Sequence, residues 1–84
     1  MTAFLASVRV TLKPTINDPQ GLTIANALRT LGFDSVAGVR AGKYIQVTLD
    51  APTKAEAERQ VREMCEKLLA NPVIERFTFE IEAE

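Results

Sequence analysis

Apolar and polar residues alternate along three stretches of the chain, residues 4–13, 43–50 and 73–82. This two-residue period is typical of strands that bury one face. A weaker alternation over residues 35–40 predicts a fourth strand, and Ala41-Gly42 offers a tight turn that would join it to 43–50 as a hairpin. The pattern therefore predicts four strands, with the middle two adjacent along the chain.

A first helix is predicted from Asp18 to the glycine at position 32. Asp18 is placed to accept a backbone N–H from the first turn, and Pro19 suits the first helical position. Gly32 can adopt the left-handed conformation that ends a helix. One apolar face follows from the spacing of Ile24, Ala27, Leu28 and Leu31. We expect this face to be covered by another layer of the protein.

A second helix is predicted from Thr53 to about residue 70. Thr53 and Glu56 have the Thr-x-x-Glu spacing of a capping box, and Asn71-Pro72 ends the helical pattern. Its apolar face is made by Ala57, Val61, Met64, Cys65 and Leu68. Since no histidine is present to activate Cys65, we interpret this cysteine as a small core residue.

The element order βαββαβ predicts an α+β fold with a single domain, residues 1–84. Two helices with one apolar face each, and strands with one apolar face each, favour a two-layer sandwich with both helices on one side of a four-stranded antiparallel sheet, as in ferredoxin-like folds. The other sheet face and the free sheet edges would then be available to partner chains. The apolar residues expected on that open face are Leu5, Val36, Tyr44 and Ile74.

Composition narrows the classes of function. Ten basic and eleven acidic residues nearly cancel, which argues against binding to nucleic acid or to an anionic membrane. One cysteine and no histidine exclude the usual zinc ligand sets, and no apolar run approaches membrane-spanning length. These features predict a soluble, cytoplasmic protein. A chain of 84 residues also buries little surface alone, so we expect it to associate with other chains.

Few residues are candidates for chemistry. Asp18 could be a general base, but its position favours a helix cap. Arg40, Gly42 and Lys43, together with Lys13, could form an anion site where the predicted hairpin approaches the end of the first strand, although such cations are usually solvated. RNA-binding domains with this element order need stacking aromatics, and Tyr44 stands alone here. The loop after the first strand, residues 13–17, lacks the glycine and arginine of an acylphosphatase phosphate loop.

Three segments resemble the PurS family, the small subunit of phosphoribosylformylglycinamidine (FGAM) synthase. They are Asp18-Pro19-Gln20-Gly21, Val39-Arg40-Ala41-Gly42-Lys43 and the segment from Met64 to Glu75. Each segment alone would be weak support, but all three occur in order and in register, and the resemblance covers essentially the whole chain.

The resemblance implies a place in de novo purine biosynthesis, where FGAR, glutamine and ATP give FGAM. In this family the large PurL subunit binds ATP and FGAR and the PurQ glutaminase releases ammonia. A PurS subunit has no active site, cofactor or metal of its own, while the complex uses ATP, Mg and glutamine. It forms homodimers or dimers of dimers, bridges PurL and PurQ, and helps to keep ammonia on course.

A docking hypothesis follows from residues on the connections between elements, where binding residues tend to lie. The hypothesis names Asp18, Gln20, Arg40, Lys43, Asn71 and Glu75 as partner-docking residues and no residue as catalytic. Within it, Arg40 and Lys43 supply charge complementary to an acidic partner. The alternative function is a free-standing regulatory module that binds an amino acid or nucleotide between paired βαββαβ domains. A third reading, a small phosphatase, would require turnover of an acyl phosphate by the isolated chain.

Overall fold

The structure is a computed structural model that describes residues 1–84. Its elements, in chain order, are β1 (Thr2–Leu12), α1 (Pro19–Thr30), β2 (Gly42–Ala51), α2 (Lys54–Met64), the π-helical turn η1 (Cys65–Leu69) and β3 (Glu75–Ala83). The two predicted helices and the three strongly alternating strands are confirmed, and η1 continues α2 to the predicted end near residue 70.

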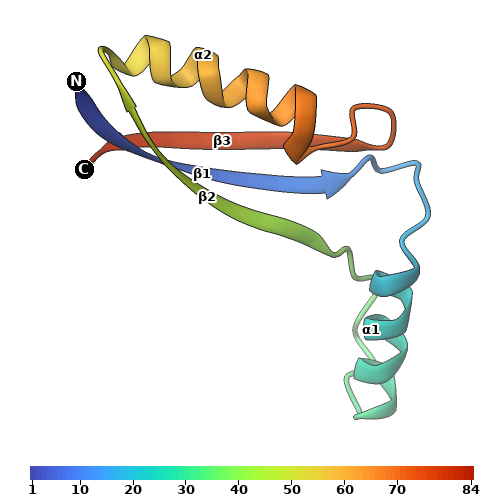
Figure 1. Cartoon of the computed structure of the whole chain (residues 1–84). Helices are drawn as coiled ribbons and strands as arrows, with labels where there is room; N and C mark the ends of the chain where they lie inside the picture. The colour runs from blue at the N-terminus through green and yellow to red at the C-terminus, as the bar shows by residue number, and fades with distance from the viewer.

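The sheet has β1 at its centre, with β2 and β3 antiparallel on either side (Figure 1). The register places Val8 opposite Ile45 on β2 and Phe79 on β3. The apolar side chains at alternate positions of the three strands therefore lie on the same face of the sheet. Helix α2 covers this face. The predicted inward faces of the three strands are confirmed.

The hydrophobic core lies between this sheet face and α2. From α2 and η1 it receives Ala57, Val61 and Cys65, none of which has any exposed surface. Its other members are Phe4, Ala6, Val8, Val10, Ala51, Ala70 and Ile81. Cys65 is therefore a core residue, as predicted, and burial raises the pKa of its thiol.

The predicted fourth strand is wrong, because residues 35–40 have no strand structure and the sheet has three strands. Arg29 of α1 explains the difference. Its guanidinium donates hydrogen bonds to the carbonyls of Val36 and Ala37, at 3.1 and 3.3 Å, so this segment returns along α1 instead of pairing with a strand. The predicted hairpin at Ala41-Gly42 is absent for the same reason, and β2 pairs directly with β1.

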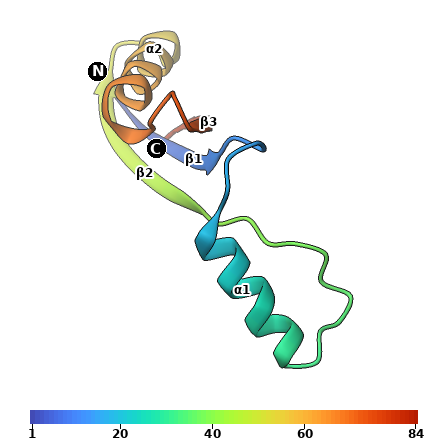
Figure 2. The same cartoon turned by 90° about the vertical axis from the view of Figure 1, so that its right-hand side faces the viewer.

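The prediction that both helices cover one sheet face is also wrong. Helix α1 and its return segment, residues 19–40, stand off the end of the sheet (Figure 2). We call these residues the arm. The Cα radius of gyration is 16.5 Å, whereas a closely packed domain of this length would have about 12 Å. The molecule measures 52 × 27 × 14 Å because the arm extends it along one axis.

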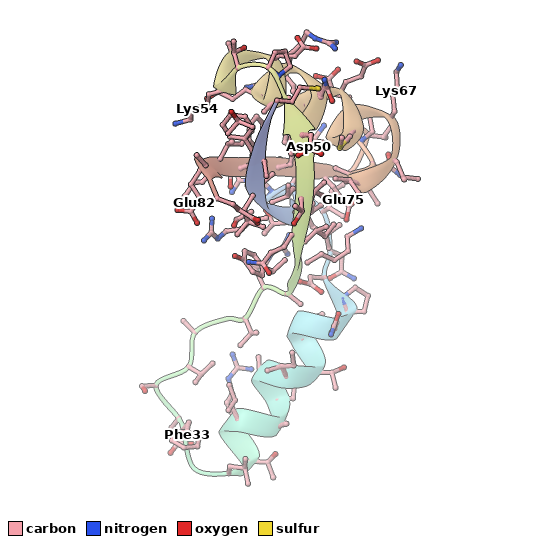
Figure 3. All side chains as sticks on the ribbon, turned by 60° about the vertical axis from the view of Figure 1, so that its left-hand side comes forward. Phe33, Asp50, Lys54, Lys67, Glu75 and Glu82 are labelled. Atoms are coloured by element: carbon pink, nitrogen blue, oxygen red, sulfur yellow. The ribbon has the colours of Figure 1, made fainter.

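The predicted apolar stripe on α1 exists, but this chain does not cover it. Ile24 is exposed, Leu31 is 73% exposed, and Phe33 lies at the far end of the arm (Figure 3). The return segment instead packs on the neighbouring helix face, where Gly21 and Ala25 are buried. Apolar surface is therefore concentrated on the arm.

The open face of the sheet is more polar than predicted. Arg9 lies 3.5 Å from Glu80, and its guanidinium stacks over the ring of Tyr44. Of the four apolar residues expected on this face, Val36 lies in the arm and Ile74 in the turn before β3. No helix of the chain has the length and apolar character needed to cross a membrane.

Candidate functional site at the base of the arm

Asp18 connects both ends of the arm. One carboxylate oxygen accepts the N–H of Gly21 at 2.9 Å, which caps α1 as predicted. The other accepts the N–H of Ala41 at 2.7 Å, where the return segment meets β2. The residue is only 5% exposed, and both oxygens are used within the chain. Asp18 therefore closes the base of the arm in addition to starting its helix.

Gly21 permits the closest backbone approach at this base. A Cβ on Gly21 would lie 2.2 Å from the carbonyl oxygen of Val39 and 3.0 Å from a carboxylate oxygen of Asp18. A Cβ atom does not approach a carbonyl oxygen this closely in proteins. Only glycine therefore fits here while the return segment keeps its position. Arg29, farther along α1, holds the same segment through Val36 and Ala37.

The hydrogen bonds from the Ala41 and Gly21 amides lower the pKa of Asp18, and the charge of Arg40 lowers it further. A carboxyl whose pKa is lower in the folded state stabilises the fold above its unfolded pKa of about 4. This contribution is lost as the pH falls through the lower, folded value.

We predict that Asp18→Asn removes this part of the acid sensitivity. The asparagine amide has only one acceptor oxygen, so its NH2 group would face the N–H of either Gly21 or Ala41, and the variant should also be less stable at pH 7 than the native chain. Urea unfolding from pH 7 to pH 2 measures both effects as a difference between the two proteins. The difference is needed because Glu56, with its pKa lowered to about 2 by Arg59, titrates in the same range. A constant difference across this range would contradict the prediction.

A hollow of about 210 Å³ opens between the base of the arm and the end of the sheet. Its lining includes Asp18, Gln20, Lys43 and Glu75, four of the six residues proposed from the sequence. Within it the Lys43 ammonium lies 3.9 Å from the Glu75 carboxylate and donates to the carbonyl of Leu69 at 3.3 Å. Lys43 therefore already has partners within its own chain.

Asn71 and Glu75 shape the turn between η1 and β3. The Glu75 carboxylate accepts the N–H of Asn71 at 2.7 Å, and the Asn71 side-chain oxygen accepts the N–H of Val73 at 3.0 Å. The carbonyl of Ile74, in the same turn, accepts the N–H of Lys13 at 2.8 Å. The turn is thereby attached to the loop that leads into the arm.

Arg40 lies outside the 210 Å³ hollow and lines a different one. Its guanidinium donates to the carbonyl of Lys13 at 3.0 Å, so it links the return segment to the end of β1. The anion site suggested by the sequence is therefore not assembled as predicted. The Lys43 side chain pairs with Glu75, and the Arg40 side chain binds the backbone carbonyl of Lys13.

The polar groups of the site hold segments of the chain in place. Asp18 is occupied by two backbone amides, and the thiol of Cys65 lies in the core. No three His, Cys, Asp or Glu side chains gather as possible metal ligands. Sequence reasoning missed the contributions of Val39 and Ala41, which act through their backbone atoms. The glycine three residues after Asp18 was the available signal for a close backbone approach.

Comparison with known proteins places the whole chain in one family. The family model named PurS, phosphoribosylformylglycinamidine (FGAM) synthase, matches residues 5–83. The PurS subunit of Synechocystis sp. is 50% identical over 76 residues, which cover 90% of this chain and 76% of that protein. The PurS subunit of Archaeoglobus fulgidus is 45% identical over 74 residues, covering 88% of this chain and 92% of the relative.

Solved structures of similar proteins share the fold. Bacillus subtilis PurS overlays with a TM-score of 0.85 at 40% identity, covering 94% of this chain and 98% of that one. A chain in the structure of PurLQS from Thermotoga maritima also has a TM-score of 0.85, at 33% identity, with full coverage of both chains. The second overlay includes the arm as well as the sheet.

Proposed function

This chain belongs to the PurS family of FGAM synthase subunits, and we propose that it joins the other two subunits of that enzyme without an active site of its own. The family acts in purine biosynthesis, where the complete enzyme converts FGAR, glutamine and ATP into FGAM. The Thermotoga maritima relative was solved as PurLQS, which supports an assembly role for the present chain with PurL and PurQ.

The observation that carries this proposal is the arm. It stands off the sheet with apolar side chains uncovered, while Asp18 and Gly21 fix its base tightly to the rest of the chain. A projection with exposed apolar surface suits contact with other polypeptides. The same proposal includes a role in the transfer of ammonia from the glutaminase to the synthetase. A subunit that bridges these two would lie beside the path that the ammonia takes.

The same features support a homodimer or a dimer of dimers. The outer edges of β2 and β3 have no strand partner, and the α1 stripe has no cover from its own chain. A second copy could cover both. The docking residues proposed for PurL and PurQ remain Asp18, Gln20, Arg40, Lys43, Asn71 and Glu75. Of these, the exposed Gln20, Arg40 and Asn71 present side chains directly, whereas the buried Asp18 acts by fixing the arm.

The proposal assigns ATP, Mg and glutamine to the other subunits and places the complex in the cytoplasm. The alternative, a free-standing regulatory module, is not favoured, because the two relatives, matched over 76% and 92% of their own length, are both named as synthase subunits.

Reconstitution tests the proposed function. We expect purified PurL and PurQ of the same organism to form FGAM from glutamine at a low rate, and addition of this chain to raise that rate at least tenfold. Ammonia supplied directly to PurL should support FGAM formation without the chain, because the chain contributes no chemistry. Full glutamine-dependent activity in the absence of the chain would overturn the proposal, as would FGAM formation by the chain alone.

A further inference from the structure

A second hollow, of about 310 Å³, lies beside the base of the arm and contains two arginines. It is lined by Thr11, Leu12, Pro14, Arg40 and Arg76. Thr11 and Arg76 are cross-strand partners on β1 and β3, and Arg40 comes from the return segment of the arm. Three segments far apart in the sequence therefore bring two guanidinium groups to one place.

Both arginines lack a carboxylate partner within this chain. Neither takes part in any ion pair, whereas Arg9 and Arg59 do. Arg40 donates one hydrogen bond, to a backbone carbonyl, and Arg76 makes no side-chain hydrogen bond within the chain. Nearby acids are already engaged: Asp18 accepts two backbone amides, and Glu75 is shared by Lys43 and Asn71. The lining of the hollow thus carries two positive charges and no acidic residue, in a chain whose net charge is −1, and the acid that interacts with Arg40 is the buried Asp18.

We propose that Arg40 and Arg76 form a docking site for an acidic segment of a partner subunit, with two carboxylates of that segment each bound by one guanidinium. This proposal rests on the proposed function, since it requires a partner protein. The planar guanidinium binds a carboxylate through two parallel hydrogen bonds, and Thr11 adds a hydroxyl to the same wall. Leu12 and Pro14 offer apolar surface for the methylene groups of an aspartate or glutamate.

The lining favours protein carboxylates over a free phosphate group. Phosphate sites usually combine backbone amides of a glycine-rich loop or a helix N-terminus with a cation. This hollow has neither, and its arginines are exposed side chains at an open surface. Two separate guanidinium groups at such a surface match two separate carboxylates on an extended segment.

The position of Arg40 makes this docking site sensitive to the arm. Its guanidinium is held by the carbonyl of Lys13, and its neighbour Ala41 is held by Asp18. A partner that binds Arg76 on the sheet and Arg40 on the arm at once therefore contacts both parts of the molecule. The site is complete only while the base of the arm is closed.

Binding to purified PurL tests the proposal. We expect Arg40→Glu combined with Arg76→Glu to raise the Kd at least tenfold at low salt, because two attractions become repulsions. Arg76→Lys should bind more weakly than the native chain but more tightly than the double reversal, since the charge remains while the two parallel hydrogen bonds of the guanidinium are lost. The matched control is two reversals away from the hollow, Lys54→Glu with Lys67→Glu, on and after α2 (Figure 3). This control changes the net charge equally and should leave the Kd within about twofold.

The outcomes separate the docking site from the proposed function. If the native chain fails to bind PurL and PurQ, the proposed function is wrong and this site with it. If the native chain binds and the Arg40/Arg76 double variant binds equally well, only the docking site is wrong. Circular dichroism melting should show that the variants fold.

A second measurement distinguishes the class of ligand. Arginine side-chain nitrogen signals in NMR should shift when hexaglutamate peptide is added to the native chain at low salt. Inorganic phosphate at the same charge concentration should cause smaller shifts. Stronger saturable binding of phosphate than of the peptide would overturn the assignment to protein carboxylates.

Discussion

Replacement of Gly21 by alanine is expected to open the base of the arm. The new Cβ would lie 2.2 Å from the Val39 carbonyl oxygen, so the return segment must move away from α1. That movement pulls Ala41 away from Asp18 and breaks the 2.7 Å hydrogen bond. Overpacking of this kind costs about 1–3 kcal/mol. We expect a loss of this size in the free energy of unfolding, together with faster hydrogen exchange at the Ala41 amide.

Gly38→Ala is the matched control for this change. No atom lies within 4 Å of a Cβ built on Gly38, and its backbone is outside the left-handed region. The free energy of unfolding should therefore be unchanged or slightly higher, since alanine restricts the unfolded chain. Urea unfolding and amide exchange measure both variants. Equal stability and equal Ala41 exchange in Gly21→Ala and the native chain would show that the arm base is not closed as described.

The second large effect is expected from charges on the apolar stripe of α1. Ile24→Asp together with Leu31→Asp should convert a homodimer or dimer of dimers into smaller species. Burial of one large aliphatic side chain contributes about 1.5–3 kcal/mol, and a carboxylate in its place adds a desolvation cost. Both positions are exposed in the single chain, so the folded chain itself should tolerate the changes. Sedimentation velocity measures the distribution of species directly.

Thr23→Asp with Thr30→Asp provides a control on the same helix. Both positions are exposed, and each lies one residue before a residue of the stripe. The control therefore places the same two charges at the same spacing, on a helix face rotated by about 100° from the stripe. The control should keep the oligomeric state of the native chain. Retention of that state by the Ile24/Leu31 variant would exclude the stripe as the subunit contact, and a monomeric native chain would remove the basis for the prediction.

Local features of this fold could be predicted from the sequence because their causes are local. Asp18 and Thr53 cap their helices through amides three residues ahead, at 2.9 and 3.2 Å. The two-residue alternation of β1 predicted its buried face, and the register confirms it. Glu63 and Lys67, four residues apart, form an ion pair across one helical turn.

The wrong predictions concern which segments of the chain pack or pair with one another. The stripe on α1 showed that a helix face is apolar, but periodicity does not show whether the same chain or another one covers it. Residues 35–40 alternate weakly, and the Arg29 side chain competes for their carbonyls across seven and eight residues. Neither the detached arm nor the missing strand follows from the spacing of apolar residues alone.

At the candidate site the sequence predicted residue identities better than their contacts. Asp18 was expected to cap a helix, but its shorter hydrogen bond reaches Ala41, 23 residues away. The sequence suggests an anion site that includes Lys43 and Arg40, yet Lys43 pairs with Glu75 across the end of the sheet. Arg76 lies on a strand, and its approach to Arg40 depends on the fold and not on their spacing in the sequence.

The length of α1 magnifies any small error at its base. Twelve residues give a helix of about 18 Å, so a tilt of roughly 10° at Asp18 displaces the Phe33 end by about 3 Å. That displacement exceeds the tolerance of a close-packed contact, where shifts below 1 Å already lose attraction. The two hydrogen bonds of Asp18 and the close approach at Gly21 thus set the direction of the helix. The accuracy of any contact made at its far end depends on these distant atoms.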